Sequence, residues 1–506
     1  MKKGKSIFRN LNSSWLLLGA NTISQLVQVP IALHFLDKEM FGLFALVSQF
    51  VSTLMLVELG MTSALTRLFM EGRVMGRDAY NRVWSSGLCI FGIQAVTLTT
   101  AVLCAAPFLT KFFKVPETIA HTTLLLFLIM GFYGVIRYVS NIYSIALVAG
   151  QRMDIMNNAG IVSVFLQFFI FLGALFLRAG VWSYVIANIV TLPVGILILR
   201  SSAIKHGLVG TFCRTNIHSE DLFRIFRLGL GVFVTACFNM FMTSSILLFG
   251  GVFLKLNEVA VLAVNLKLPI LLINLFQRIP GSADPVLGDC VSRNNLERFR
   301  FGWIIIVKVT LIVSLIGSGL YFLWSRIIIS AWTSEDMVLP VFPTLLLALI
   351  PIRFILHYLM VMSLSAFKEL RLISGWLIAE MFFATLLFVL LGRKYGLTGL
   401  LMANVLSIFT GSLWCGVRST AQLSGIRVRH MASAVGNSLA IPGAFLAVMC
   451  TLYTPTNHIA EIPFLVVVTF LWLIVSGFSF WLISVNLSER IYLKSMIWNP
   501  RHQQSL

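Results

Sequence analysis

Charged residues are scarce in this chain of 506 residues. Asp, Glu, Lys and Arg together make up 11% of it, whereas soluble domains carry about 25%. A soluble protein of this length would leave much of its surface without polar cover, so a soluble multidomain protein is excluded. The residues AVILMFWYC make up 58% and the mean hydropathy is +0.91. This composition also excludes disorder and predicts an all-α polytopic membrane protein.

Paired cysteines, metal-ligand clusters and nucleotide-binding loops are also missing. The seven cysteines are scattered without a CxxC pair, so the sequence indicates neither a zinc site nor a disulfide framework. The eight histidines do not have metal-ligand spacing, and there is no glycine-rich phosphate loop. No long outer loop carries the acidic residues that a membrane glycosyltransferase would use. We therefore expect no enzyme activity, no metal site and no cofactor.

Acidic residues are half as frequent as basic ones, with 19 Asp and Glu against 38 Lys and Arg, for a net charge of +19. In a membrane protein such an excess collects in cytoplasmic loops, so a nucleic-acid partner is not expected. With the N-terminus inside, about 26 basic residues fall on the inner side and about 8 on the outer side. The bias predicts that both termini are cytoplasmic and that the number of spans is even. The basic start MKKGKSIFRN lacks a following cleavage site and is interpreted as a cytoplasmic tail.

Apolar runs of about 20 residues or more predict membrane helices. The connections between them are short, and the longest, 201–224 and 280–300, are basic. The sequence predicts fourteen spans, at 13–36, 41–65, 83–109, 119–149, 158–177, 181–200, 225–250, 257–279, 301–331, 338–366, 371–391, 397–417, 432–454 and 463–487.

An internal repeat emerges when the sequence is shifted by 216 residues. Ile136-Arg137-Tyr138 then falls on Ile352-Arg353-Phe354, and Ala187-Asn188-Ile189-Val190 on Ala403-Asn404-Val405-Leu406. The shift spans six helices, an even number, so the two halves form parallel repeats. The predicted organisation is an N-terminal six-helix bundle, a cytoplasmic linker, a second six-helix bundle, and two extra helices with a cytoplasmic tail. These four parts are 1–200, 201–224, 225–417 and 418–506.

Two arginines near the centres of their spans, Arg137 and Arg353, are equivalent in the repeat. Ionisable groups at this depth are costly and indicate function. Tyr133, Ser140, Asn141 and Ser144 share a helix face with Arg137, and His357 lies four residues after Arg353. The arginines either line a cavity or pair with an intramembrane carboxylate, Glu58 or Glu380, and the two interpretations are not exclusive.

Two lysines add to this positive charge. Lys267 lies at mid-depth, whereas Lys308 lies closer to the cytoplasmic end, where it could also snorkel to the surface. The four cations outnumber the two carboxylates, so a cavity built from them would attract an anion. Arginine suits phosphate in particular, because its planar fork makes two parallel hydrogen bonds.

Uncharged polar stripes follow two further helices. Asn21, Gln25 and Gln28 are spaced 4 and 3 apart in the first span, and Asn239 lies on a similar stripe in the seventh. Amides that face a cavity suit sugar hydroxyls. Polar residues that hold helices together are an equally good interpretation.

The second span carries a recognisable pattern. Phe41-Gly42 begins it, and Glu58-Leu59-Gly60 followed by Ala64-Leu65-Thr66-Arg67 ends it. This pattern resembles that of the bacterial polysaccharide and O-antigen flippases of the multidrug/oligosaccharidyl-lipid/polysaccharide exporter superfamily, although that family usually has Asp where this chain has Glu58. The resemblance implies a V-shaped pair of bundles around a central cavity, in the bacterial cytoplasmic (inner) membrane. The implied cargo is an undecaprenyl-pyrophosphate-linked oligosaccharide, flipped to the outer leaflet by alternating access. Implied partners are membrane lipids and the polysaccharide polymerase and chain-length machinery.

Other functions compete with this hypothesis. A cation-coupled multidrug antiporter of the same superfamily would require carboxylates in the cavity, and the first span contains none between Ser13 and Leu36. A scramblase or an assembly scaffold would not need arginines repeated at one offset. Glu58 is expected to pair with Arg67 or Arg137, or to carry a coupling proton, and Glu380 is the second candidate for such a role.

Overall fold

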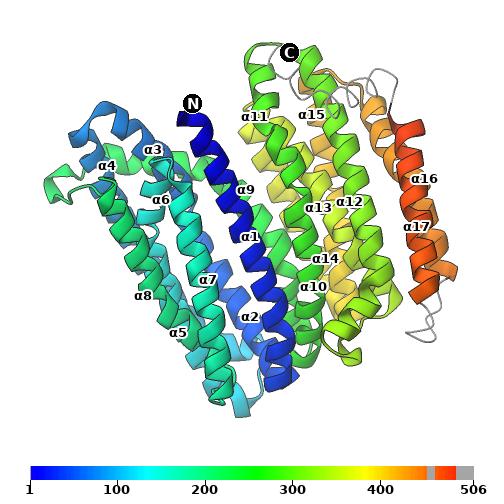
Figure 1. Cartoon of the computed structure of the whole chain (residues 1–506), viewed down its shortest axis with the longest axis horizontal. Coiled ribbons are helices and arrows are strands. Elements are labelled where there is room, and N and C mark those ends of the chain that lie inside the picture. The colour runs from blue at the N-terminus through cyan, green and yellow to red at the C-terminus, as the bar shows by residue number, and fades with distance from the viewer. Residues whose placement is uncertain (1, 453–461, 486–506) are drawn as a thin grey trace. The chain divides into compact units, whose positions relative to one another are not determined.

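The computed structural model describes residues 2–452 and 462–485, and almost all of them are helical (Figure 1). No strand occurs in these two ranges. Eleven helices in the described part of the chain are long and apolar enough to cross a membrane. The predicted class of an all-α polytopic membrane protein is therefore confirmed.

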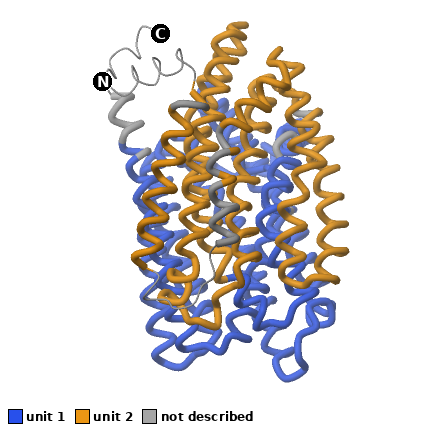
Figure 2. Tube along the Cα trace, turned by 90° about the vertical axis from the view of Figure 1, so that its right-hand side faces the viewer, with its two compact units in different colours: residues 1–263 blue, residues 264–506 orange. Residues whose placement is uncertain are grey.

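The chain divides into two compact units, Met1–Ala263 and Val264–Leu506 (Figure 2). The first unit ends within α10 (Leu256–Phe276). Its other helices are α1 (Lys2–Phe35), α2 (Lys38–Leu54), α3 (Met61–Met75), α4 (Arg77–Phe112), α5 (Glu117–Ser140), α6 (Ile142–Ala149), α7 (Met153–Phe176), α8 (Trp182–Lys205) and α9 (Ser219–Phe253).

The second unit contains the rest of α10 and seven further α-helices. These are α11 (Arg278–Ser292), α12 (Leu296–Trp332), α13 (Val341–Ala366), α14 (Leu370–Leu406), α15 (Val417–Ser424), α16 (Val428–Leu452) and α17 (Ile462–Ser479). Between α14 and α15 the helix changes form, with a 3₁₀ turn at Ser407–Phe409 and a π-helix at Ser412–Gly416.

The predicted spans differ from these helices where the backbone departs from a regular helix. The predicted span 41–65 breaks into α2 and α3, because Leu59 and Gly60 have positive φ. The predicted spans 371–391 and 397–417 fall on either side of Gly396, where α14 has a non-helical backbone with a φ of +55° and so consists of two helical segments. The predicted loop 280–300 is wrong over its first part, since α11 continues to Ser292. Pro280 fits there, because it lies in the first turn of α11, where its missing N–H costs nothing. The predicted helix ends at 454 and 487 lie outside the described residues, and so does the predicted C-terminal cytoplasmic tail.

The connection between α8 and α9 packs on α4. Arg77 donates hydrogen bonds to the carbonyls of Gly207 and Val209, and the hydroxyl of Tyr80 donates to that of Leu208 at 2.6 Å. Leu208 belongs to the apolar core at this end of the first unit, together with Trp84 and Phe69. The predicted linker is therefore a packed part of the first unit. Ile225 of α9 is buried in the same core, so this unit extends into the second sequence repeat.

Candidate functional site

A cavity of about 430 Å³ lies inside the first unit, between α1, α5, α6, α7 and α8. Three predicted site residues, Arg137, Asn21 and Asn141, line it. The rest of the polar face around Arg137 also lines the cavity: Tyr133, Ser140 and Ser144. The spacing of these residues along the sequence thus identified one wall of the cavity.

The guanidinium of Arg137 is exposed in this cavity. Its side chain makes no hydrogen bond or ion pair with any residue in the part of the chain that the structure describes. The hydroxyl of Ser140 donates to its backbone carbonyl at 2.8 Å. None of the residues that line the cavity is acidic. Guanidinium groups make strong hydrogen bonds to carboxylates and phosphates, and the residues that line this cavity offer Arg137 no such partner.

The opposite wall carries polar residues that the sequence did not single out as ligands. Ser163 and Gln167 come from α7, and Asn188 and Thr191 come from α8. Gln167 donates to the amide oxygen of Asn188 at 3.0 Å. Two signals could have identified them, namely the four-residue spacing of Ser163 and Gln167 and the repeat match at Asn188. Together with Asn21 and Asn141, these amides and hydroxyls suit the recognition of sugar hydroxyls.

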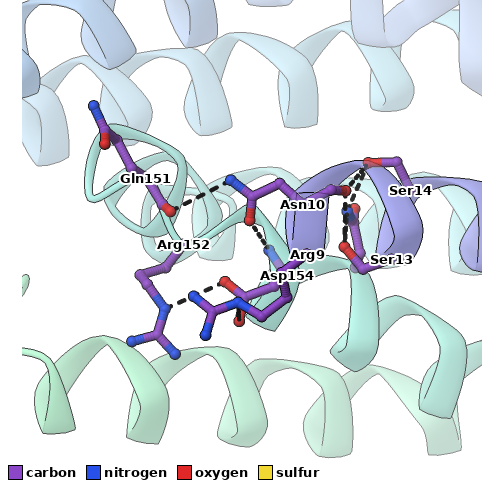
Figure 3. A network of polar contacts seen from close by, with 8 residues as sticks. Arg9, Asn10, Ser13, Ser14, Gln151, Arg152 and Asp154 are labelled. Carbon is purple, nitrogen blue, oxygen red and sulfur yellow. Dashed lines mark hydrogen bonds and ion pairs between the residues drawn. The ribbon is translucent and has the colours of Figure 1, made fainter. Parts of the chain in front are cut away.

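A polar network joins α1 to α7 next to the cavity (Figure 3). The carboxylate of Asp154 forms ion pairs with Nε of Arg9 at 3.0 Å and with Nε of Arg152 at 3.2 Å. The backbone N–H of Asp154 donates a hydrogen bond to the side-chain oxygen of Asn10. The amide of Asn157, buried, donates to the hydroxyls of both Ser13 and Ser14. Leu17, three residues after Ser14 on α1, and Met156, between Asp154 and Asn157 on α7, line the cavity. The network therefore fixes the spacing of α1 and α7 at one end of the cavity.

The flippase-like pattern on α2 and α3 turns out to be a packing motif. Gly42 approaches the carbonyl of Leu256 so closely that no side chain would fit, and Gly60 approaches Gly229 in the same way. Glu58 caps α3 by accepting the backbone N–H of Thr62 at 3.2 Å. The backbone carbonyl of Glu58 accepts a hydrogen bond from the side-chain amide of Gln94 at 2.9 Å. The amide oxygen of Gln94 in turn accepts a hydrogen bond from the hydroxyl of Tyr138.

The expected pairing of Glu58 with Arg67 or Arg137 is not formed among the described residues. Arg67 instead binds Glu71, which also binds Arg224 at 2.7 Å. The reason is geometric: Glu58 lies in the 3₁₀ turn Met55–Glu58, where its carboxylate is directed to the free N–H groups at the start of α3.

Arg353 occupies a different environment from its repeat equivalent. Its Nη2 lies 2.6 Å from Glu380 Oε1, and these side chains are 3% and 0% exposed. Arg353 also donates to the hydroxyl of Ser407. Glu380 accepts the backbone N–H and the hydroxyl of Ser412, whose oxygen lies 2.7 Å from Nδ1 of His357. Of the two interpretations offered for Arg353, the structure therefore shows the pairing with a buried carboxylate, Glu380.

The remaining predicted site residues do not line the cavity in the first unit. Gln25 is exposed on α1, and Gln28 bonds Ser24 of the same helix at 3.1 Å. Asn239 is half-buried on α9. Lys267, half-buried, and Lys308, buried, belong to α10 and α12 in the second unit.

Comparison with known proteins shows the fold but not the cargo. No family model matches the chain, and no curated protein is significantly similar to it in sequence. A solved structure of the lipid II flippase MurJ, inward closed, matches 96% of this chain and 99% of its own at 15% identity, with a TM-score of 0.68. An inward-facing multidrug resistance MATE family transporter of the MOP superfamily matches 81% of this chain and 95% of its own at 16% identity, with a TM-score of 0.60. A Pyrococcus furiosus MOP superfamily transporter, whose binding pocket is described as having reverse polarity, matches 82% and 94% at 16% identity, with a TM-score of 0.51. The chain therefore has the fold of MOP superfamily transporters.

Proposed function

We propose that this protein flips an undecaprenyl-pyrophosphate-linked oligosaccharide, an O-antigen or related polysaccharide unit, across the bacterial cytoplasmic membrane by alternating access. The observation that carries the proposal is Arg137, an exposed guanidinium without a counter-charge in a polar intramembrane cavity. The fold supports transport, and the lipid II flippase among the structural matches supports a lipid-linked cargo.

The chemistry of the cavity matches the two parts of such a cargo. The pyrophosphate linker is anionic, and a planar guanidinium binds phosphate oxygens through parallel hydrogen bonds. The oligosaccharide offers many hydroxyls, for which Asn21, Asn141, Asn188 and Thr191 supply amide and hydroxyl partners. Membrane lipids surround the transporter, both termini are cytoplasmic, and polysaccharide polymerase and chain-length proteins would receive the flipped unit.

The test is export of lipid-linked glycan in cells that depend on this chain, normalised to the amount of transporter in the membrane. Arg137→Ala should lower export per molecule by about tenfold or more, because a desolvated charge partner is lost. Arg137→Lys should restore it in part, since the charge remains while the fork is lost. Arg200→Ala is the matched control, because Arg200 is exposed near the end of α8 and is not part of the cavity. Wild-type export by Arg137→Ala would refute the proposal.

The alternative function is a cation-coupled multidrug antiporter, which the MATE structures among the matches support at the level of the fold. An antiporter for cationic drugs requires a carboxylate facing its cargo. The residues that line the cavity include one cation and no carboxylate, and Glu380 already neutralises Arg353. Efflux of a cationic dye that depends on this chain, with no effect on glycan export, would favour the alternative.

A further inference from the structure

The cavity around Arg137 and the buried ion pair of Arg353 lie at equivalent places in the two repeats. The shift of 216 residues that aligns Arg137 with Arg353 also aligns residues lining the cavity with residues of the ion-pair network. Asn141 falls on His357, Asn188 on Asn404, Thr191 on Ser407, and Gly195 on Gly411. The two halves of the sequence thus each carry one copy of the same set of positions around one arginine.

The second copy shows how this arrangement holds a carboxylate. One oxygen of Glu380 accepts Arg353 at 2.6 Å, and the other accepts the backbone N–H of Ser412 at 2.8 Å and its hydroxyl at 2.7 Å. Ser407, the equivalent of Thr191, bonds the same guanidinium nitrogen at 3.2 Å. The site is filled, because Glu380 is 0% exposed and Gly411 leaves just enough room for its carboxylate.

The first copy lacks the groups that fill the second. The shift places Val164 on Glu380 and Gly160 on Trp376, which is buried and packs edge-on against His357. Both Val164 and Gly160 line the cavity. Where the second repeat has a carboxylate and an indole, the first has the short apolar side chain of Val164 and a glycine without a side chain. The first repeat therefore has open space in place of these two groups, and its arginine has no internal carboxylate partner.

We propose that the cavity around Arg137 is an oxyanion site, and that the anion occupies the position which the carboxylate of Glu380 takes in the second repeat. The carboxylate of Glu380 thus shows, within the same chain, how an anion would lie against the arginine. The volume of about 430 Å³ is far larger than one carboxylate needs, so the anion binds together with the group that carries it. The proposed function rests on this anion being part of the cargo. Either a phosphate of the lipid linker or the carboxylate of an acidic sugar has the required chemistry.

A tethered carboxylate in the first repeat tests the proposal. Val164→Glu recreates the residue found at the equivalent position and should pair with Arg137. In the purified full-length chain, farnesyl pyrophosphate is the phosphate probe, and glucuronate is the competitor for the carboxylate source. Val164→Glu and Arg137→Ala should each weaken binding of the probe by about tenfold or more. The first neutralises the guanidinium with a carboxylate, and the second removes it. Val164→Gln fills the same space without the charge, so it should weaken binding of the probe clearly less than Val164→Glu does. Arg200→Ala, which lies outside the cavity, should bind the probe like the wild type.

A thermal unfolding series verifies that the variants fold and that the new pair forms. Val164→Glu should unfold at a higher temperature than Val164→Glu combined with Arg137→Ala, because the second change leaves a carboxylate without its partner. Equal unfolding temperatures, or equal binding by Val164→Glu and Val164→Gln, would overturn the proposal.

The same variants distinguish a lipid phosphate from an acidic sugar as the source of the anion. They also distinguish failure of the oxyanion site from failure of the proposed flippase function. Binding of glucuronate but not of farnesyl pyrophosphate, lost in Val164→Glu, would support the oxyanion site and assign it to an acidic sugar. Loss of probe binding in Val164→Glu with wild-type export of glycan in cells would support the site while refuting its role in the proposed flippase. Arg137-independent binding of both probes would refute the site itself.

Discussion

Nη2 of Arg353 lies 2.6 Å from Oε1 of Glu380, and the two side chains are buried together inside the second unit. Arg137, the equivalent of Arg353 in the sequence repeat, has no such partner among the described residues and is exposed in a cavity. Two arginines that the sequence predicts as a matched pair therefore differ in charge environment. The second unit therefore contains a closed ion pair, whereas the first contains a cavity with an exposed guanidinium in its wall.

The ion pair of Arg353 and Glu380 should be required for stability. Glu380→Gln leaves a buried guanidinium without its counter-charge, which typically costs about 3–5 kcal/mol. We expect a lower unfolding temperature of the purified protein and less protein in the membrane. The double variant Arg353→Met with Glu380→Leu should recover much of the loss, because it removes both charges. An unfolding temperature of Glu380→Gln equal to that of the wild type would contradict a structural role for the pair.

Gly60 should tolerate alanine much less well than Gly207. Both have positive φ, +73° and +64°, so both substitutions incur a similar backbone cost. A Cβ at Gly60 would meet the carbonyl of Gly229, whereas nothing lies within 4 Å at Gly207. Gly60→Ala should therefore be destabilising by about 1–3 kcal/mol more than Gly207→Ala, as expected for overpacking. Thermal unfolding of the two variants measures the difference, and equal values would refute close packing of α3 on α9.

Asn157 should contribute more than Arg9 to the stability of the network that joins α1 and α7. Asn157→Ala removes hydrogen bonds to Ser13 and Ser14 and leaves the buried hydroxyl of Ser13 with one partner fewer, at a cost of about 1–3 kcal/mol. Arg9→Ala removes an ion pair whose arginine is 53% exposed, and such pairs contribute about 0–1 kcal/mol. Unfolding temperatures in the same detergent compare the two. A larger effect of Arg9→Ala would show that Asp154, not Asn157, secures this end of the cavity.

Cys213, exposed in the connection between α8 and α9, should react readily with maleimide. Its Sγ lies 2.9 Å from the hydroxyl of Thr215, and this bond, with the N–H groups of Thr215 and Asn216, lowers the pKa of the thiol. A lowered pKa means that the reactive thiolate forms at lower pH. In a background where Cys213 is the only cysteine, the labelling rate should rise with pH through a midpoint below that of an ordinary thiol. Thr215→Val should move the midpoint upward, and an unchanged midpoint would contradict this cause.

The same connection should face the cytoplasm. A membrane-impermeant maleimide added to intact cells should leave Cys213 unlabelled, and it should label this residue in inverted vesicles. Cysteines introduced at Arg77 and Arg298 should behave like Cys213, and one at Arg178 should show the opposite pattern, because the basic residues favour a cytoplasmic N-terminus. Labelling of Cys213 and the Arg77 position from outside would reverse the orientation.

The class of the fold was predictable because hydropathy acts on whole segments. Each helix of about 20 apolar residues satisfies its own backbone hydrogen bonds, so a membrane helix is encoded locally. Breaks within helices were less predictable. The turn at Leu59 and Gly60 lies against the backbone of Gly229, a contact that hydropathy does not encode. The kink at Gly396 has a positive φ, which a hydropathy pattern does not indicate either.

The candidate site divides in the same way. Helical periodicity by itself determined that Tyr133, Arg137, Ser140, Asn141 and Ser144 share a face, and that face does line the cavity. The offset of 216 residues determined that Arg137 and Arg353 are equivalent. Only the tertiary structure decided which arginine is free, because the partner of Arg353 lies 27 residues away on another helix. Whether an arginine has a counter-charge depends on the neighbours that packing brings to it. Glu380 closes an ion pair on Arg353, whereas its repeat equivalent, Val164, lines the same cavity as Arg137 and offers no charge.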